Sequence, residues 1–140
     1  HRHTPEIEQA LNTGADGVVF GSSSVLFTPH LLPINRGILA TCYAKLKNEF
    51  DTKNAIELLN DAYSGMPFVL VDERSPSTKS TLGSNSAHLT ARVDPRTGLL
   101  IVLCAIDNLG KGASGQAVQC ANIALGIEET LGLSKIGINP

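Results

Sequence analysis

The sequence has little of what marks several classes of protein. Its 140 residues carry a formal net charge of −2 and no basic block or patch of interleaved basic and aromatic residues, which argues against nucleic-acid binding. The longest apolar runs, such as 99–106, are far too short to span a bilayer. Three cysteines, Cys42, Cys104 and Cys120, form no C-x-x-C pair, which argues against a disulfide framework or a zinc site. We therefore expect a cytoplasmic protein with no metal, membrane or nucleic-acid partner.

Size and composition fit one globular domain. A chain of 140 residues, 42% of them apolar, is long enough to bury its own core. It begins with His1 rather than methionine, and no charged-then-apolar signal segment follows. This start predicts a fragment, a processed chain or a trimmed chain, whereas 137–140 are compatible with a natural end.

Residues 4–11 have the pattern of a short helix. Thr4 can cap it, Pro5 suits the first helical position, and Glu6 favours the positive end of the helix dipole. Gly14 is a suitable stop.

The rest of the chain predicts strands and two longer helices. Apolar and β-branched residues predict strands at 17–28 (one strand, or two with a break at 21–24), 37–45, 67–72, 87–93 and 99–105. Helical spacing predicts a helix from Thr52 to a stop at Gly65 and another over 113–125, with residues 73–80 as a surface loop between strands.

Two features fix the expected fold class. Residues 94–98 predict a hairpin turn, and strand 99–105 is apolar on both faces, as a central strand is. The last helix is expected to pack through Ala117, Ala121, Ala124 and Leu125. This order predicts an α+β fold: a mixed, largely antiparallel sheet with helices packed on one face.

His1-Arg2-His3, directly before the predicted first helix, is the first candidate for chemistry. Imidazoles transfer protons near neutral pH, and a helix N-terminus lowers the pKa of a nearby histidine, although Glu6 acts in the opposite direction. The competing interpretation is a set of exposed terminal residues or the remnant of an affinity tag.

The second candidate is the loop 29–36, which contains His30 and Arg36. An arginine where a loop meets a strand is well placed to hold a phosphate or carboxylate through its planar guanidinium. Arg36 also fits a surface residue that pairs with an acid.

The third candidate is Asp107-Asn108-Leu109-Gly110-Lys111-Gly112-Ala113-Ser114-Gly115-Gln116, where a buried strand ends in a small-residue loop. Such a loop exposes backbone N–H groups and allows a ligand to approach the main chain. The spacing is neither G-x-G-x-x-G nor a Walker loop, and the glycines also fit a purely structural role in close helix packing.

The other polar residues give weaker indications. His88 lies on the polar side of a strand and is expected to be solvated, and Gly83-Ser84-Asn85 fits a turn or a substrate-facing loop. There is no G-x-S-x-G segment for a serine nucleophile, and none of the cysteines lies in a polar turn that would make it reactive.

Three segments, in order, resemble the N-acetyl-gamma-glutamyl-phosphate reductase family. His1-Arg2-His3-Thr4-Pro5-Glu6-Ile7 is similar to the family's H-R-H-x-P-E-I signature, and Phe27-Thr28-Pro29-His30-Leu31-Leu32-Pro33 with Arg36-Gly37-Ile38 to its F-T-P-H-L-x-P…R-G-I segment. The run from Asp107 to Gln119 is nearly identical to its D-N-L-x-K-G-A-x-G-Q-A-V-Q run. The likeness covers essentially the whole chain.

The resemblance implies an NADP-dependent phosphorylating aldehyde dehydrogenase of arginine biosynthesis. The family reduces N-acetyl-glutamyl phosphate to the semialdehyde. A cysteine thiolate attacks the acyl phosphate, phosphate leaves, and NADPH supplies hydride to the thioester. The cysteine segment and the Rossmann-type NADP domain precede the H-R-H signature in the family, so the chain is expected to be inactive alone.

The resemblance also assigns residues to roles. His3, with His1 as the alternative, would be the catalytic acid/base. Arg36, with His30 and Arg2, would bind the substrate carboxylate or phosphate. Asn108 would orient the nicotinamide, and Lys111, Gly112 and Gly115 would lie near the cofactor.

The implied organisation has two parts. Residues 1–106 would form a catalytic and dimerisation domain like the C-terminal domain of glyceraldehyde-phosphate dehydrogenase, and 107–140 a loop and helix that pack on the missing Rossmann domain. The sheet would form a subunit interface in a homo-oligomer, a dimer or a tetramer. The alternative function is a stand-alone, non-catalytic dimerisation or assembly module.

Overall fold

The computed structural model describes residues 3–13 and 21–138. It divides the chain into two compact units, His1–Pro33 and Ile34–Pro140. The domain boundary predicted between residues 106 and 107 remains a prediction. Within this chain, residues 106 and 107 belong to the same unit.

The first unit contains the predicted N-terminal helix, α1 (Thr4–Asn12), with Pro5 and Glu6 in its first turn. The N-cap residue is His3, whose carbonyl accepts a hydrogen bond from the Ile7 N–H at 3.0 Å, and no side chain caps the helix. Capping by Thr4 is therefore wrong. The predicted stop at Gly14 lies outside the described residues.

The strand predicted over 17–28 is also wrong where the structure describes it. Residues 21–28 form no strand, and 17–20 lie outside the described residues. The Ser23 and Val25 N–H groups donate instead to the side chains of Asn12 and Glu8, at 2.7 and 2.9 Å. Backbone groups must find partners, and here the preceding helix supplies them in place of a neighbouring strand.

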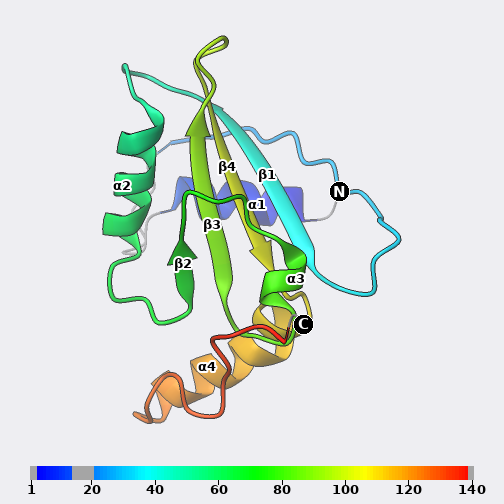
Figure 1. Ribbon diagram of the computed structural model, residues 1–140. Helices are drawn as coiled ribbons and strands as arrows, with labels where there is room; N and C mark the ends of the chain where they lie inside the picture. The colour runs from blue at the N-terminus through cyan, green and yellow to red at the C-terminus, as the bar shows by residue number, and fades with distance from the viewer. Residues whose placement is uncertain (1–2, 14–20, 139–140) are drawn as a thin grey trace. The chain divides into compact units, whose positions relative to one another are not determined.

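The second unit is built on a four-stranded sheet in the order β1-β4-β3-β2 (Figure 1). Its strands are β1 (Ile38–Lys45), β2 (Val69–Val71), β3 (Ala87–Val93) and β4 (Leu99–Ile106). β4 pairs antiparallel with β1 and β3, and β2 pairs parallel with β3. The predicted mixed, largely antiparallel sheet with a central 99–105 strand is confirmed.

The turn between β3 and β4 forms as its sequence predicts. The Gly98 N–H donates to the Asp94 carbonyl at 2.8 Å, and the Thr97 hydroxyl donates to the Asp94 carboxylate at 2.6 Å. Gly98 has a φ of +67°, which glycine adopts without strain.

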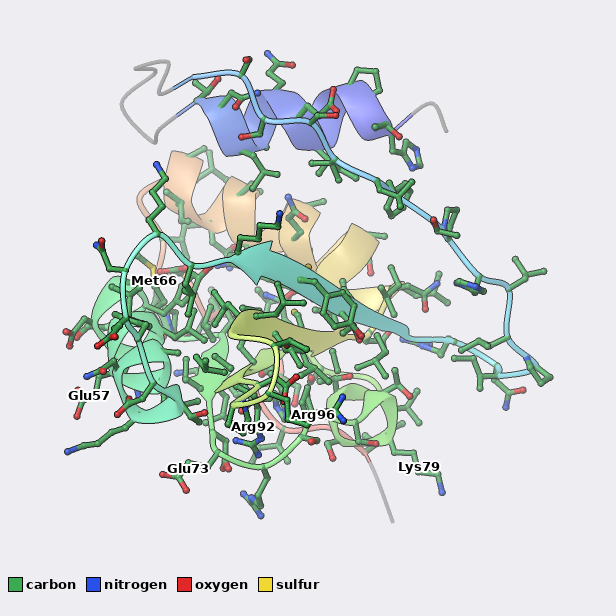
Figure 2. The ribbon with its side chains drawn as sticks, turned by 90° about the horizontal axis from the view of Figure 1, so that it is seen from above. Glu57, Met66, Glu73, Lys79, Arg92 and Arg96 are labelled. Carbon is green, nitrogen blue, oxygen red and sulfur yellow. The ribbon has the colours of Figure 1, made fainter. Side chains whose placement is uncertain are left out.

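Helix α2 (Thr52–Ala62) also follows its local signals. The Asp51 carboxylate accepts from the Asn54 N–H, and the Asn54 side chain accepts in return from the Asp51 N–H. Ala55 is buried on its inner side, whereas Glu57 points outward at the periphery (Figure 2). The predicted loop 73–80 runs into a short helix, α3 (Thr78–Thr81), which Ser77 caps.

Within this chain the predicted packing face of the C-terminal helix is exposed, and its packing on a Rossmann domain remains a prediction. A π-helical turn, η1 (Gly110–Ser114), leads into α4 (Gly115–Ala124), where Ala117, Ala121, Ala124 and the following Leu125 are exposed and Gly115 and Asn122 are buried. The Asn122 amide donates to the carbonyls of Glu129 and Leu131, at 3.2 and 3.0 Å. The chain after α4 offers carbonyl groups, so a polar side of the helix is covered and the alanine side is left open.

The C-terminal segment returns to the loop before β3. The Asn85 N–H donates to the Ser134 carbonyl, the Ser86 hydroxyl to the Lys135 carbonyl and the Ile138 N–H to the Leu82 carbonyl, at 2.8, 2.6 and 2.8 Å. Loop 82–86 is thereby held between the end of the chain and β4.

Apolar surface remains on the edge strand β1, where Ile38, Leu39 and Tyr43 are 47%, 51% and 67% exposed. Among the described residues, the structure contains no helix long and apolar enough to cross a membrane.

Candidate active site

Arg36 and Asp107 meet because of the register of β1 and β4. Ile38, the first residue of β1, lies opposite Ile106, the last residue of β4, so the residues just outside both strand ends become neighbours. Arg36 donates from Nε to Asp107 Oδ1 at 3.0 Å and from Nη2 to Oδ2 at 2.5 Å. The Asp107 side chain is fully buried, and that of Arg36 is 32% exposed.

The Asp107 carboxylate also collects three backbone N–H groups. Gly83 donates to Oδ2 at 2.5 Å, and Leu109 and Gly110 donate to Oδ1 at 2.9 and 3.1 Å. Burial acts to raise the pKa of Asp107, but the hydrogen bonds from Arg36 and these N–H groups outweigh it and hold the pKa well below its usual value. Asp107 is therefore an ionised carboxylate that organises three separate segments of the chain.

Asn108 is fixed by the neighbouring backbone. Its Oδ1 accepts a hydrogen bond from the Gly37 N–H at 2.6 Å, so its amide group presents Nδ2, a donor, to any other partner. Gly37 has a φ of +117°, and a Cβ at this position would lie 2.8 Å from Thr78 Cβ. This approach therefore requires glycine.

The glycines of the 107–116 segment serve close packing. A Cβ at Gly110 would lie 2.5 Å from the Ser84 carbonyl oxygen, and one at Gly115 would lie 2.3 Å from Asn85 Oδ1. A Cβ at the exposed Gly112 would make only ordinary contacts, the nearest at 3.4 Å. Of the three glycines, only Gly112 is open to a ligand. It is also the only one of the three at which a Cβ would fit without a clash.

Lys111 turns into the protein. Its Nζ donates to Gln119 Oε1 at 2.7 Å and lies 5.5 Å from the centroid of the buried Phe68 ring. Gln119 Oε1 also accepts from Asn85 Nδ2 at 2.9 Å, and Gln119 Nε2 donates to the Glu129 carboxylate at 2.6 Å. The ammonium group is thus part of an internal network.

A cavity of about 400 Å³ lies beside these groups. Its lining includes Arg36, Ser84, Asn85, Leu109, Ser114 and Ser134. Asn85 is only 2% exposed, and no described residue donates a hydrogen bond to its Oδ1. The cavity is thus lined by one guanidinium group, whereas the unpartnered amide oxygen of Asn85 is buried.

The structure brings some predicted residues together and not others. Arg36, Asn108, Lys111, Gly112 and Gly115 all belong to the second unit, around Asp107 and the cavity. His3 and His30 belong to the first unit. The remaining two predicted residues, His1 and Arg2, lie outside the described residues.

Three important residues were not assigned a role from the sequence: Asp107, Asn85 and Gln119. Asp107 carried a signal, because it is an acid directly after a wholly apolar strand, where a buried charge requires a partner. Asn85 belonged to a predicted turn or substrate-facing loop, but its pairing with Gln119 across 34 positions depends on how α4 packs against loop 82–86.

Other titratable groups lie apart from the cavity's lining. His88, expected to be solvated, is half-buried, and burial lowers its pKa while the charge of Asp72 acts in the opposite direction. Burial raises the pKa of the Cys104 thiol, which disfavours the thiolate that a nucleophile needs. Among the described residues, no group of His, Cys, Asp and Glu is arranged to hold a metal ion.

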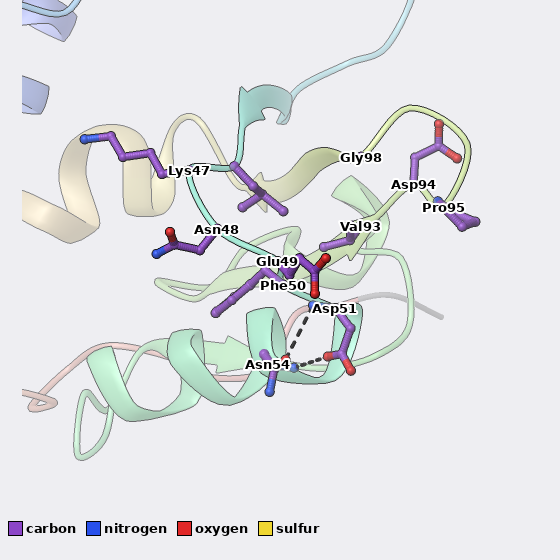
Figure 3. Close-up of a pocket in the computed structure, with 11 residues that line it drawn as sticks. Lys47, Asn48, Glu49, Phe50, Asp51, Asn54, Val93, Asp94, Pro95 and Gly98 are labelled. Atoms are coloured by element: carbon purple, nitrogen blue, oxygen red, sulfur yellow. Dashed lines mark hydrogen bonds between the residues drawn. The ribbon is translucent and has the colours of Figure 1, made fainter.

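A second cavity, of about 710 Å³, is formed by residues 46–51, Asn54 and the hairpin around Asp94 (Figure 3). Its polar groups serve local structure: Asp51 and Asn54 cap α2, and Asp94 holds the hairpin turn. It contains none of the residues predicted to be functional.

Comparison with known proteins identifies the class first. The model of the family described as the semialdehyde dehydrogenase dimerisation domain matches residues 1–108, and the chain belongs to this family.

Its curated relatives then point to one enzyme. The chain is 50% identical over 143 residues to the N-acetyl-gamma-glutamyl-phosphate reductase of Thermoanaerobacter sp. (strain X514), and 49% identical over 142 residues to those of Frankia casuarinae and Moorella thermoacetica. Each comparison covers 100% of this chain and 40% of the relative. The resemblance stated from the three segments is confirmed, for a chain that spans about two fifths of the relatives' length.

Proposed function

We propose that a polypeptide containing this chain is an NADP-dependent N-acetyl-gamma-glutamyl-phosphate reductase that acts in the cytoplasm in arginine biosynthesis. The observation that carries the proposal is the cluster of Arg36, Asp107 and Asn108 at the ends of β1 and β4. It joins the second and third of the reductase-like segments, which lie 71 residues apart, into one site.

Arg36 would bind an anionic group of the substrate. Asp107 sets the plane of its guanidinium group and keeps the charge in place, so the arginine does not have to be ordered when substrate binds. His30 and Arg2, which belong to the first unit, are further candidates for substrate binding from the resemblance alone.

His3, with His1 as the alternative, would transfer the proton. His3 is the N-cap residue of α1, and an imidazole is suited to proton transfer near neutral pH.

The nicotinamide cofactor would supply the hydride when bound. The fixed orientation of Asn108 fits this role, because its Nδ2 can donate to the carboxamide oxygen of a nicotinamide. The open side of Gly112 allows a close approach, and Gly115 lines the adjacent cavity. Lys111 fits less well, since contact with a cofactor requires its ammonium group to leave Gln119.

The test is complementation. The chain is joined to the part of the Thermoanaerobacter relative that it does not cover, and oxidation of NADPH by N-acetyl-glutamyl phosphate is followed. We expect turnover by the fusion and none by the chain alone. Arg36→Lys should lower kcat/KM about 100-fold, since the loss of a charged hydrogen-bonded pair amounts to about 2–3 kcal/mol. Arg74→Lys is the matched control, because Arg74 forms a similar fork with Asp72 on the surface. An inactive fusion that is folded would contradict the proposal.

A second candidate is a stand-alone dimerisation or assembly module. The exposed apolar side chains of β1, on the edge of the sheet, favour a homo-oligomer, either a dimer or a tetramer. Sedimentation of the chain measures its assembly. A stable dimer together with an inactive fusion would favour this candidate over the reductase.

A further inference from the structure

We propose that the cavity beside Arg36 binds a carboxylate group and not a phosphate group. This inference deepens the proposed function and rests on it for the claim that the cavity is a substrate site. It follows from the N–H donors of Arg36 that Asp107 does not use, and from the directions of the surrounding backbone N–H groups.

One edge of the Arg36 guanidinium group remains for a ligand. A guanidinium has five N–H donors in one plane, and Asp107 takes the Nε donor and one Nη2 donor. The Nη1 donors and the second Nη2 donor remain on a group that is 32% exposed and lines the cavity. A planar carboxylate matches such an edge with two parallel hydrogen bonds.

The charge balance favours a monoanion. Asp107 is ionised and lies 2.5 Å from Arg36, so the pair carries no net charge. A phosphate group carries about 1.5 to 2 negative charges near neutral pH and would require additional cations for compensation. Lys111, from the same glycine-rich loop as Asp107, is directed to Gln119.

Five backbone N–H groups around Asp107 already have partners within the protein. Gly83, Leu109 and Gly110 donate to the Asp107 carboxylate. Gly112 donates to the Asp107 carbonyl at 3.0 Å, and Ser114 donates to the Leu109 carbonyl at 3.1 Å. A phosphate site in a glycine-rich loop depends on N–H groups that point at the ligand, and here they point at an internal carboxylate. The Asp107 carboxylate thus accepts the N–H hydrogen bonds that a bound phosphate would otherwise accept.

Asn85, which also lines the cavity, belongs to a network of amide groups. Lys111 can only donate and the Glu129 carboxylate can only accept, so the Gln119 amide has one allowed orientation. Gln119 Oε1 then takes the Asn85 Nδ2 donor, and Asn85 Oδ1 is left against Gly115 without a partner among the described residues. Asn85 is neutral and its Oδ1 is buried, so this residue supplies no charge to compensate a dianion.

The experiment is an NMR titration of the ¹⁵N-labelled chain at constant ionic strength and pH 7, with N-acetylglycine as the monocarboxylate and inorganic phosphate as the competitor. The Arg36 Nε–H resonance is assigned by its loss in Arg36→Lys. The Arg74 Nε–H resonance is the internal control, since Arg74 forms the same kind of fork with Asp72 but is 86% exposed.

We expect N-acetylglycine to shift the Arg36 resonance and the amides of the cavity wall saturably, with phosphate binding at least about tenfold more weakly. Phosphate binding of equal or greater strength overturns the inference. So does the absence of binding by both anions, or a shift at Arg74 as large as that at Arg36. Because the wild-type titration compares two ligands, the result does not depend on the stability of any variant.

Failure of the inference and failure of the proposed function give different results. Turnover by the fusion together with phosphate binding at Arg36 would leave the reductase proposal standing and overturn the carboxylate assignment. An inactive fusion together with selective carboxylate binding would leave a carboxylate site in a protein of another activity.

Discussion

Arg36 and Asp107 lie 71 positions apart in the chain, and Arg36 Nη2 is 2.5 Å from Asp107 Oδ2. The pair joins the segment before the edge strand β1 to the segment after the central strand β4. The Asp107 carboxylate also accepts hydrogen bonds from the Gly83 N–H and from the Leu109 and Gly110 N–H groups in the turn before α4. One buried carboxylate therefore determines the position of the guanidinium group, the 82–86 loop and the start of the last helix.

Replacing Asp107 should destabilise the protein more than any exposed acid does. Asp107→Asn leaves Arg36 uncompensated and gives the Gly83 and Gly110 N–H groups a poorer acceptor. We expect a loss of about 2–3 kcal/mol in the free energy of unfolding, less than the roughly 3–5 kcal/mol for a fully buried pair, because Arg36 is partly exposed. Urea denaturation monitored by circular dichroism measures it. Asp72→Asn, which breaks the exposed Asp72–Arg74 pair, should leave the urea midpoint nearly unchanged. Equal effects of the two substitutions would contradict the central role of Asp107.

Acid should unfold the protein partly through Asp107. The folded-state pKa of this carboxyl is lowered, so the unfolded state takes up a proton at a higher pH than the folded state does. Its contribution to stability is fully present above about pH 5 and is lost as the pH falls through about 4 toward its lowered pKa. Unfolding free energies measured from pH 2 to 7 should rise with pH, and the rise should be smaller in Asp107→Asn. An unchanged slope would show that other carboxyl groups carry the dependence.

Two glycines of the same segment should respond in opposite ways to alanine. Gly115→Ala places a Cβ 2.3 Å from Asn85 Oδ1 and should destabilise the protein by about 1–3 kcal/mol. Gly112→Ala meets nothing closer than 3.4 Å and should be neutral or stabilising by up to about 1 kcal/mol, since alanine favours the helix. Thermal unfolding of both variants provides the comparison. A destabilised Gly112→Ala variant would contradict the steric argument.

His88 should titrate below its ordinary pKa of about 6.5. Burial disfavours its charged form, and the Asp72 carboxylate partly offsets this effect. Asp72→Asn should therefore lower the pKa of His88 further, while Asp94→Asn, on the hairpin turn, should leave it unchanged. Two-dimensional NMR of the imidazole resonances measures the shift, with His88→Gln for assignment. A rise of the His88 pKa in Asp72→Asn would contradict the inference that the Asp72 carboxylate raises this pKa.

Much of the secondary structure could be predicted because its signals are local. Strand 87–93 alternates, the 94–98 turn contains its own hydrogen-bonding groups, and β4 is apolar on both faces as a central strand must be. Helix α2 carries its cap at Asp51. Each of these elements depends on residues that lie within a few positions of one another.

One failed prediction, the Thr4 cap, was off by a single residue, whereas the failed strand prediction depends on distant partners. Apolar and β-branched residues in 17–28 suit a strand, but a strand needs a neighbouring strand to pair with. The N–H groups of Ser23 and Val25 instead donate to side chains of α1. The alanine side of α4 has the spacing of a packed face. That side is exposed within this chain, so its packing on a Rossmann domain remains a prediction, while the polar side is covered through Asn122.

The sequence by itself determined the family, the α+β class and the residue types of the candidate site, since these follow from short motifs and from local patterns. Only the tertiary structure decided how the site is organised. The antiparallel register of β1 and β4 brings Arg36 onto Asp107, and the packing of α4 directs Lys111 inward. The glycine-rich loop therefore encloses an internal carboxylate, because its N–H groups and the guanidinium group satisfy that buried charge before any ligand is bound.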